Sequence, residues 1–394
     1  MEENRIKKIL FPFITFLLII FSDSALGNIS YPRFANFYGA NLRPGMPQEQ
    51  LDFLSRYSLI VVGETALQAQ KELSYIKSKN PNLIILYYIS VRGMNPNEKD
   101  MRSEFWLCDP AGQFISPWPG RYLPNQALPE VNKLIIEKAR KALMEPQIDG
   151  IFLDSFSQTI TYLNNGQLDA DRDGTPDDPQ RLNKAWATGL LRIAHGIRAI
   201  KSGVIIMANG WSPLNFAYDV LNGVLFEDQL NRMEDIGNGK RKGSPIIANE
   251  LLAAYQKWQS VPNMPHITAF VDGGGAMQNP WEWAKLSNKS KGELINNARS
   301  NIQMMRLNLC FTLMGEGYAA FDYGTVARGQ KWWFPEWDIK LGVPIEPMQK
   351  LDGYWQRKFE HGVVYVNPYP KPVRIKNDKD ELFLNPFDGK IVPR

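Results

Sequence analysis

The stretch IDGIFLDSFS, residues 148–157, decides the fold of this chain. Its apolar residues Ile151–Leu153 predict a buried β-strand, and an acid, Asp154, follows them directly. A strand of a parallel sheet has a nearly continuous apolar run, because helices cover both faces of the sheet. The stretch therefore raises the question of why a buried strand ends on a carboxylate.

Apolar runs of this kind recur along the chain and alternate with segments of helical periodicity. The eight expected strands are Phe34–Tyr38, Leu59–Val62, Leu83–Ile89, Gly150–Leu153, Val204–Ala208, Val224–Phe226, Ile267–Val271 and Tyr318–Phe321. The expected helices are Gln48–Tyr57, Leu67–Lys79, Pro129–Met144, 179–201, 213–222, 245–259 and 290–314. The number of strands and the chain length favour an α/β fold of the (β/α)8 TIM barrel type over an open sheet.

The C-terminal part of the chain has a different pattern. From about Phe359, apolar and polar residues alternate around Asn-Pro and Asp-Gly turns, which predicts a small antiparallel β appendage. The predicted organisation is a signal peptide at residues 1–27, a catalytic barrel at 28–355 and a C-terminal β extension at 356–394.

Residues 1–27 have the layout of a secretory signal peptide. A basic start precedes the apolar run Ile9–Phe21, and the small residues Ala25 and Gly27 follow it. The run is short for a membrane span, and no later stretch is long and apolar enough to be one. We therefore expect a secreted or periplasmic protein without a membrane span after cleavage. An uncleaved N-terminal anchor is the alternative.

The charge pattern argues against one class of partner, and the cysteine content excludes one class of fold. The net charge is +4, and it stays +4 without residues 1–27, which carry three bases and three acids. The charge is spread along the chain without a basic block, which argues against nucleic acid as a partner. The two cysteines, Cys108 and Cys310, are too few for a disulfide scaffold. Whether these two residues pair, and whether the chain forms oligomers, is left open by the sequence.

Polar residues, most of them acidic, follow six of the eight expected strands. They are Glu64, Asp154, Asn209, the pair Glu227 and Asp228, Asp272, and Asp322. The carboxyl ends of barrel strands meet at one mouth, where active sites lie. A single acid there is explained as a helix N-cap. A cluster of acids costs repulsion and desolvation, so it indicates a functional site instead.

The residue inventory narrows the chemistry of that site. The three histidines lack metal-ligand spacing, which leaves no material for a zinc site or a Ser-His-Asp triad. The DGGGA stretch at 272–276 matches neither the G-x-G-x-x-G nor the Walker A pattern. Glycoside hydrolysis needs a carboxylic acid, a carboxylate, polar groups for sugar hydroxyls and aromatic platforms, and no cofactor. The inventory favours this chemistry.

Further side chains near the mouth are predicted to contact the substrate. The predicted substrate-binding residues are Asn209, Trp211, Asp272, Asp322, Tyr323, Glu64 and Trp106. Trp118, in the same long loop as Trp106, is expected to wall the cleft. For each residue the alternative is a turn, a helix cap or simple packing.

The stretch DADRDGTPDD, residues 169–178, resembles a calcium-binding loop. Its acids at loop positions 1, 3, 5 and 9 are Asp169, Asp171, Asp173 and Asp177. Position 12 is Gln180 rather than the usual bidentate acid, although Asp178 is a substitute in a shorter loop. We expect a structural Ca²⁺ here, with a solvated acidic turn that caps the next helix as the alternative.

Several motifs together resemble the hypothetical glycosyl hydrolase family 15, which is distantly related to the α-galactosidase-like barrels. These motifs are DGIFLDSF, ANGW, LFED, MGEGYAAFDYG, WWFPEWDIKLGVP and HGVVYVNP, and the similarity covers about residues 30–370. The resemblance implies a nucleophile after the fourth strand, Asp154, and an acid/base after the sixth, Glu227. Asp228 is the alternative acid/base. Because successive residues of a strand point to opposite sides, only one of the two should face the mouth, and Glu227 is nearer the regular strand.

The predicted function is a secreted glycoside hydrolase with a two-carboxylate, retaining mechanism that acts on oligo- or polysaccharides. Two other classes stay open. One is a carbohydrate-binding barrel without turnover, and the other is a barrel hydrolase or lyase for a non-sugar substrate. The sequence specifies neither the sugar nor the anomer.

Overall fold

The computed structural model describes residues 30–37, 41–210, 212–231, 245–275, 277, 279–376 and 381–394. Within them, eight parallel strands form one sheet in chain order. They are β1 (Ala35–Asn36), β2 (Leu59–Val62), β3 (Ile84–Ser90), β4 (Gly150–Asp154), β5 (Ile205–Asn209), β6 (Gly223–Glu227), β7 (Ala269–Gly273) and β8 (Tyr318–Asp322). Phe34 pairs in parallel with Ala319, whose amide donates to the Arg33 carbonyl at 2.9 Å, so β8 returns to the first strand. The predicted (β/α)8 barrel is confirmed.

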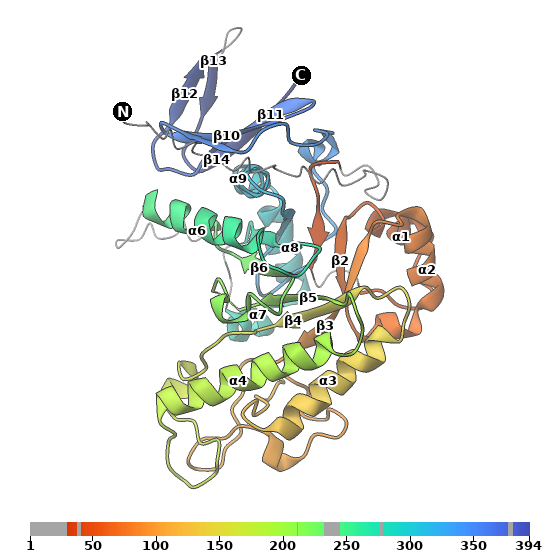
Figure 1. Ribbon diagram of the computed structural model, residues 1–394, viewed down its shortest axis with the longest axis vertical. Helices are drawn as coiled ribbons and strands as arrows, with labels where there is room; N and C mark the ends of the chain where they lie inside the picture. The colour runs from red at the N-terminus through yellow and green to blue at the C-terminus, as the bar shows by residue number, and fades with distance from the viewer. Residues whose placement is uncertain are drawn as a thin grey trace, which may run out of the picture.

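Helices surround this barrel (Figure 1). They are α1 (Gln48–Leu54), α2 (Gln70–Lys79), α3 (Pro129–Leu143), α4 (Pro179–Arg198), α6 (Pro245–Trp258), α7 (Pro280–Lys285), α8 (Asn288–Ala298) and α9 (Ile302–Thr312). Helices α3 and α4 run side by side along one flank of the barrel.

Two expected helices differ from the structure. The segment 213–222 forms only a short 3-10 turn, Asn215–Ala217, because Leu214 before it has a left-handed backbone with φ 49°. The helix expected over 290–314 is divided into α8 and α9. The side chain of Asn301 accepts a hydrogen bond from the Met304 amide and so begins a new helix.

The strands alternate between two apolar layers, as the period of a β-strand requires. One buried cluster fills the barrel interior with residues such as Phe152, Met207 and Leu225. Their neighbours in the same strands, such as Leu153, Ala208 and Phe226, belong to the larger cluster that packs against the helices. This alternation decides which of the residues at the strand ends point toward the barrel axis.

The C-terminal residues form two small antiparallel sheets. One has the strand order β14–β11–β10–β9 and the other pairs β12 with β13. The strands are β9 (Gln349–Leu351), β10 (Tyr354–Phe359), β11 (Gly362–Asn367), β12 (Val373–Lys376), β13 (Glu381–Leu384) and β14 (Asp388–Pro393). The antiparallel appendage is confirmed. It begins at Gln349, so the predicted boundary between residues 355 and 356 falls inside β10.

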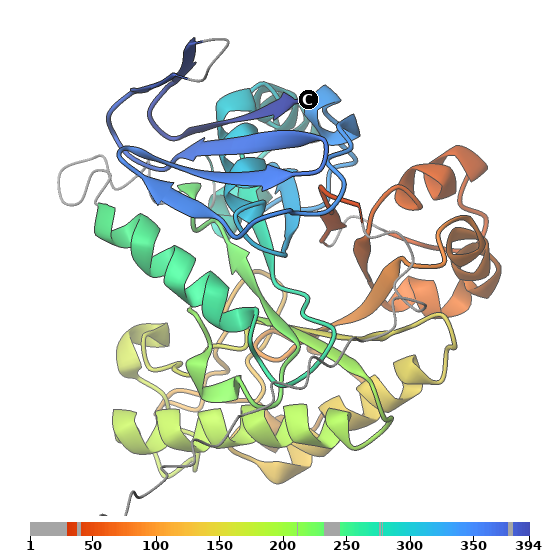
Figure 2. The ribbon, with the colours of Figure 1, turned by 45° about the horizontal axis from the view of Figure 1, so that its top comes forward.

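The larger sheet packs on α9 of the barrel, and Figure 2 shows its blue strands in front of the cyan helix. Arg306 on α9 forms a two-pronged ion pair with Asp388 on β14, at 2.8 and 2.7 Å. The fully buried Trp355 on β10 packs against Phe311, with 5.5 Å between ring centroids. Charged and apolar contacts thus join the appendage to the barrel.

Two expectations and one open question from the sequence concern the N-terminus, membrane spans and the two cysteines. Residues 1–27, the predicted signal peptide, lie outside the described residues. No helix in the described part of the chain has the length and apolar character to cross a bilayer. Cys108 and Cys310 are both buried free thiols, so the two residues do not pair.

Candidate active site

Strand alternation brings three of the predicted polar residues to one place. Asp154, Asn209 and Glu227 are the last residues of β4, β5 and β6. Each follows by two positions a residue that fills the barrel interior, so each side chain points toward the barrel axis. Neighbouring strands therefore place one carboxylate on each side of the Asn209 amide.

The Asn209 amide joins the two carboxylates directly. Its Nδ2 donates to Oδ1 of Asp154 at 3.1 Å and to Oε2 of Glu227 at 2.7 Å. Because both oxygens bond to the same nitrogen, they lie at most about 5.8 Å apart. The second oxygen of Asp154 accepts a hydrogen bond from the Tyr88 hydroxyl at 2.8 Å. These contacts hold the two carboxylates at close separation and in fixed orientations.

Arg328, in the loop after β8, lies among three carboxylates. Its Nε, Nη1 and Nη2 atoms contact Glu227 at 3.0 Å, Asp322 at 2.6 Å and Asp228 at 2.7 Å. The arginine side chain is only 4% exposed. Burial favours the neutral guanidine, but the three acids nevertheless hold the pKa of Arg328 well above its usual value. The guanidinium therefore stays charged and compensates the buried acids.

The pKa of Glu227 is raised above the ordinary value of a glutamate. Burial is the main cause, because it disfavours the carboxylate. Nearby Asp154 and Asp228 raise the pKa further, while Arg328 and the hydrogen bond from Asn209 oppose the shift. Glu227 thus keeps a proton to higher pH than an exposed glutamate, as a general acid requires.

A cavity of about 550 Å³ opens at this mouth, within the size range of small-molecule sites. Its lining residues are Tyr88, Arg92, Pro117, Trp118, Asp154, Ser155, Asn209, Glu227, Pro280, Trp283, Thr325, Val326 and Arg328. Both candidate catalytic carboxylates line the cavity, beside two tryptophans. A sugar ring that entered it would meet the acids and an aromatic surface together.

Two backbone features give this cavity its shape. Ser155 has a left-handed backbone with φ 62°, directly after Asp154, and such strain in a non-glycine residue is common at functional sites. The next amide, of Phe156, donates to the Asn209 carbonyl at 2.6 Å and fixes the turn. At Gly93, a Cβ atom would come within 2.3 Å of the Trp118 ring, so only glycine lets this ring lie against the backbone.

The structure distinguishes the two candidates for the acid/base. Glu227 lines the cavity, whereas Asp228 does not. The backbone of Asp228 is left-handed, with φ 51°, and turns the chain away from the strand. Its Oδ2 accepts hydrogen bonds from Thr325 Oγ1 and Arg328 Nη2, both at 2.7 Å. Asp228 therefore holds the loop after β8, and Glu227 faces the cavity.

Asp272 and Asp322 do not line the cavity, so their predicted role in substrate contact is corrected. Asp272 follows the interior residue Val271 by one position and faces outward. It is fully buried and accepts hydrogen bonds from the amides of Leu230 and Asn231 and from the Asn308 side chain. Burial raises the pKa of Asp272 to about 7.

Asp322 anchors the loop that carries Arg328. Besides its ion pair with Arg328, it accepts hydrogen bonds from the amides of Gly324 at 3.0 Å and Gly329 at 2.9 Å. Donors from the protein thus occupy the positions in which substrate hydroxyls were expected. Both aspartates have a structural role at this mouth.

Three more of the predicted contacts, Tyr323, Trp106 and Glu64, are not among the residues that line the cavity. Tyr323 is fully buried, and its ring packs on the cavity residue Trp283 at a centroid distance of 4.9 Å. Trp106 is buried against Tyr122 in the long third loop, at 5.7 Å. Glu64 is an exposed residue at the start of the 3-10 turn Glu64–Gln68. Trp211 lies outside the described residues, whereas Trp118 lines the cavity as expected.

Several residues of the site were not predicted, namely Arg328, Tyr88, Arg92 and Trp283. Tyr88 had a usable signal, because it follows the interior residue Leu86 by two positions in an apolar strand. Arg328 had a weaker one. A mouth with this many acids requires a cation, and Arg328 lies six residues after Asp322.

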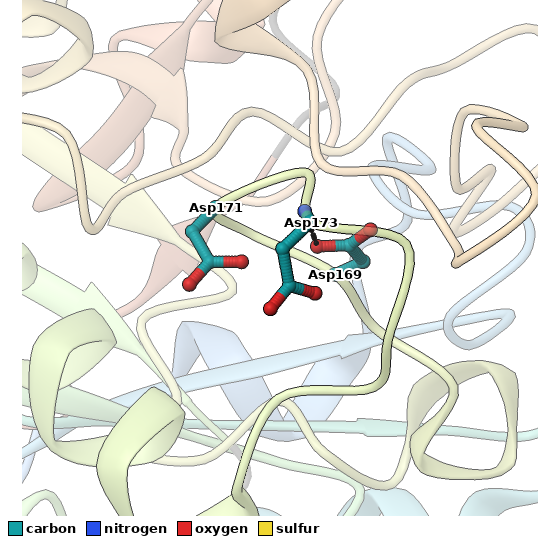
Figure 3. A group of neighbouring side chains, drawn as sticks. All are labelled: Asp169, Asp171 and Asp173. Carbon is teal, nitrogen blue, oxygen red and sulfur yellow. Dashed lines mark hydrogen bonds between the residues drawn. The ribbon is translucent and has the colours of Figure 1, made fainter.

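Three residues of the predicted calcium loop come together in the loop before α4. The carboxylates of Asp169, Asp171 and Asp173 have oxygens within 4.8 Å of one another (Figure 3). Asp169 is buried, and its oxygens accept hydrogen bonds from the amides of Asp173 and Gly174. The other two aspartates are exposed.

Two other acids of this loop have structural partners. Asp177 lies outside the group and accepts a hydrogen bond from the Ala170 amide at 2.6 Å. Asp178 caps α4 by accepting a hydrogen bond from the Arg181 amide at 2.8 Å. Of the four predicted ligands, three thus come together in the group.

A closed (β/α)8 barrel with two carboxylates at one aromatic-lined cavity is the architecture of a glycoside hydrolase. Comparison with known families agrees with this class. The chain belongs to the hypothetical glycosyl hydrolase family 15, whose sequence profile matches residues 77–363. It is therefore a glycoside hydrolase of the barrel type. None of the curated proteins matches the sequence significantly.

Solved structures of similar fold include three barrel enzymes. An α-amylase from Anoxybacillus is 10% identical with a TM-score of 0.51, and the match covers 91% of this chain and 97% of the other. Amy13B from Eubacterium rectale is 9% identical with a TM-score of 0.53, covering 93% and 97%. The ligand-free cyclic α-maltosyl-(1→6)-maltose hydrolase from Arthrobacter globiformis is 12% identical with a TM-score of 0.50, covering 92% and 98%. At these identities the similarity concerns the fold alone.

The ion pairs of Arg328 lead to a prediction about stability. Arg328→Met leaves three buried acids without their cation, so we expect a loss of about 3–5 kcal/mol in the free energy of unfolding. Without the guanidinium, the three acids would have raised pKa values in the folded state, so ionising them as pH rises destabilises the fold. In denaturant titrations, the loss in the free energy of unfolding should therefore be larger at about pH 8 than at about pH 5.

The matched control for this substitution is Arg299→Met, which removes an exposed arginine and should leave stability nearly unchanged. A deficit for Arg328→Met that is absent, or equal at both pH values, would contradict the assigned role of the guanidinium.

Proposed function

We propose that the chain is a secreted, retaining glycosidase in which Asp154 is the nucleophile and Glu227 the acid/base. The observation that carries this proposal is the Asn209 amide that bonds to both carboxylates. Retaining enzymes hold their carboxyl groups about 5–5.5 Å apart, whereas inverting enzymes need about 6.5–9.5 Å to admit a water molecule. The upper limit of about 5.8 Å between the bonded oxygens supports retention.

In the first step, an Asp154 oxygen attacks the anomeric carbon while Glu227 transfers its proton to the leaving oxygen. The products of this step are a glycosyl ester on Asp154 and a free alcohol. Hydrogen bonds from Tyr88 and Asn209 orient the attacking carboxylate. Burial of Glu227 supports its role as the acid, because it raises the pKa of the side chain and so favours the protonated form that donates in this step.

In the second step, the Glu227 carboxylate takes a proton from water, whose oxygen attacks the anomeric carbon. The ester bond breaks, and Asp154 leaves as a carboxylate. The contact from Arg328 Nε to Glu227 Oε1 stabilises the charged form that Glu227 adopts between the two steps. The same residue thus serves as acid and then as base.

Asn209 has one more atom available for the substrate. Its Oδ1 is buried, and the described part of the chain offers it no hydrogen-bond partner. Because Asn209 lines the cavity, this oxygen is suited to accept a hydrogen bond from a sugar hydroxyl. An oligo- or polysaccharide substrate outside the cell agrees with the predicted signal peptide at residues 1–27.

Substitution of the two carboxylates tests the mechanism. Glu227→Gln keeps the shape of the side chain but removes the transferable proton, so kcat should fall by about 10²–10⁴. Wild-type activity should fall as pH rises through the raised pKa of Glu227, and the variant should lack this fall. The assay uses p-nitrophenyl glycosides together with soluble starch, xylan, galactomannan, arabinogalactan and chitosan.

Asp154→Asn is the companion variant, and it should abolish hydrolysis while glycan binding persists. A proton NMR time course on the wild type should show that the first product has the anomeric configuration of the substrate. Inversion in that first product would refute retention, and full activity of Asp154→Asn would refute the assignment of the nucleophile.

We also propose that Asp169, Asp171 and Asp173 hold a structural Ca²⁺, since oxygen ligands at this spacing suit a hard cation. Saturation at about 100 times Kd would add about 2.7 kcal/mol to the stability of the folded state. Calcium should therefore raise the melting temperature relative to EGTA, and Asp171→Asn should weaken this response. Asp352→Asn, at an exposed acid of the appendage, is the control. A wild type with equal melting temperatures in calcium and EGTA would exclude the site.

A further inference from the structure

Two exposed aromatic side chains lie beside the catalytic cavity. In the described part of the chain, Tyr162, Trp281 and Phe383 are the large aromatic residues that are strongly exposed, at 56%, 49% and 52%. Phe383 is on β13 of the appendage. Tyr162 and Trp281 each contact or adjoin residues that line the cavity. An aromatic ring left in water beside a sugar-sized cavity is suited to stack on the apolar face of a sugar.

The first of these rings belongs to a ledge formed by the loops after β3 and β4. The Tyr162 hydroxyl contacts the guanidinium of Arg92. That guanidinium lies over the Trp118 ring, 5.1 Å from its centroid, and both residues line the cavity. Cation–π contact and hydrogen bonding thus hold Tyr162, Arg92 and Trp118 together, and we call them the Tyr162 ledge.

The second ring belongs to α7, in the loop after β7. Trp281 follows Pro280 and precedes Trp283 by two residues, and both of these line the cavity. The Asn279 side chain caps the helix by accepting a hydrogen bond from the Trp281 amide at 2.9 Å. The cap fixes the backbone at the start of α7, so Trp281 lies in the same helical turn as the cavity residues Pro280 and Trp283. We call Trp281 and Trp283 the Trp281 ledge.

The barrel topology places the two ledges on opposite sides of the mouth. The eight strands follow one another in chain order around the barrel, so β3 and β7 lie four strands apart. Asp154, Asn209 and Glu227 come from the intervening strands β4, β5 and β6. The cavity that contains them extends from Trp118 on one side to Trp283 on the other.

We propose that a glycan chain crosses the mouth from one ledge to the other, with sugar rings on both sides of the bond to be cut. Tyr162 stacks on a ring beyond the cavity on the β3 side, where Arg92 donates to its hydroxyls. Trp281 stacks on a ring beyond the cavity on the β7 side. The cleavage of internal bonds rests on the proposed function, whereas the binding of the chain does not.

Affinity gel electrophoresis tests this binding with chains that stay intact. The Asp154→Asn protein migrates through gels that contain soluble starch, xylan, galactomannan, arabinogalactan or chitosan. At least one polysaccharide should retard it. Adding Tyr162→Ala or Trp281→Ala should raise the apparent Kd about 3- to 10-fold each, as expected for the loss of one stacking contact. Trp281→Phe, which keeps a ring, should restore most of the affinity.

Phe383→Ala is the matched control, since it removes an equally exposed ring far along the chain from the mouth and should leave the Kd unchanged. The absence of retardation in all five gels, or Tyr162→Ala and Trp281→Ala proteins with the parent Kd, would overturn the proposal. Hydrolysis of a p-nitrophenyl glycoside by the wild type without retardation would overturn this proposal but leave the proposed function intact. If retardation depends on both ledges but the wild type hydrolyses no substrate, the proposed function is overturned and the proposed binding of the chain stands.

Discussion

The ion pairs between Arg328 and the acids Glu227, Asp228 and Asp322 are the interaction on which the mouth of this barrel depends. Carboxylates at the ends of adjacent strands repel one another and lose hydration when buried. One guanidinium, itself almost fully buried, offsets this cost for three of them. These ion pairs thus hold the loop after β8 against the end of β6, and Glu227 faces the cavity in a fixed orientation.

The same arrangement gives the two candidate catalytic acids different environments. Asp154 is half-buried and accepts hydrogen bonds from Tyr88 and Asn209, which suits a carboxylate that attacks as a nucleophile. Glu227 is buried, and its raised pKa suits a proton donor. Asn209 joins the two environments through one amide nitrogen. A buried acid with a raised pKa beside a half-buried, hydrogen-bonded carboxylate is the pattern expected for acid/base and nucleophile roles.

The sequence predicted the barrel and the central acids because apolar runs and the acids after them are local features. Period-two alternation, applied residue by residue, would also have turned Asp272 outward and found Tyr88 inside. Other features depend on distant parts of the chain. Asp322 is occupied by the amides of Gly324 and Gly329, a consequence of loop geometry that no pattern encodes. The division between α8 and α9 depends on a single cap at Asn301. The partners of Arg328 lie up to 101 residues away in sequence.

The central claim is that Asp154 forms the covalent bond to the sugar while Glu227 exchanges protons. Trapping with a 2-deoxy-2-fluoro glycosyl fluoride of the sugar that the enzyme cleaves, followed by peptide mass spectrometry, tests it most directly. The account predicts one label per chain, on the carboxylate of Asp154. A label on Glu227 or Asp228, or an enzyme that hydrolyses its substrate without ever accumulating a labelled form and releases the inverted anomer, would contradict it.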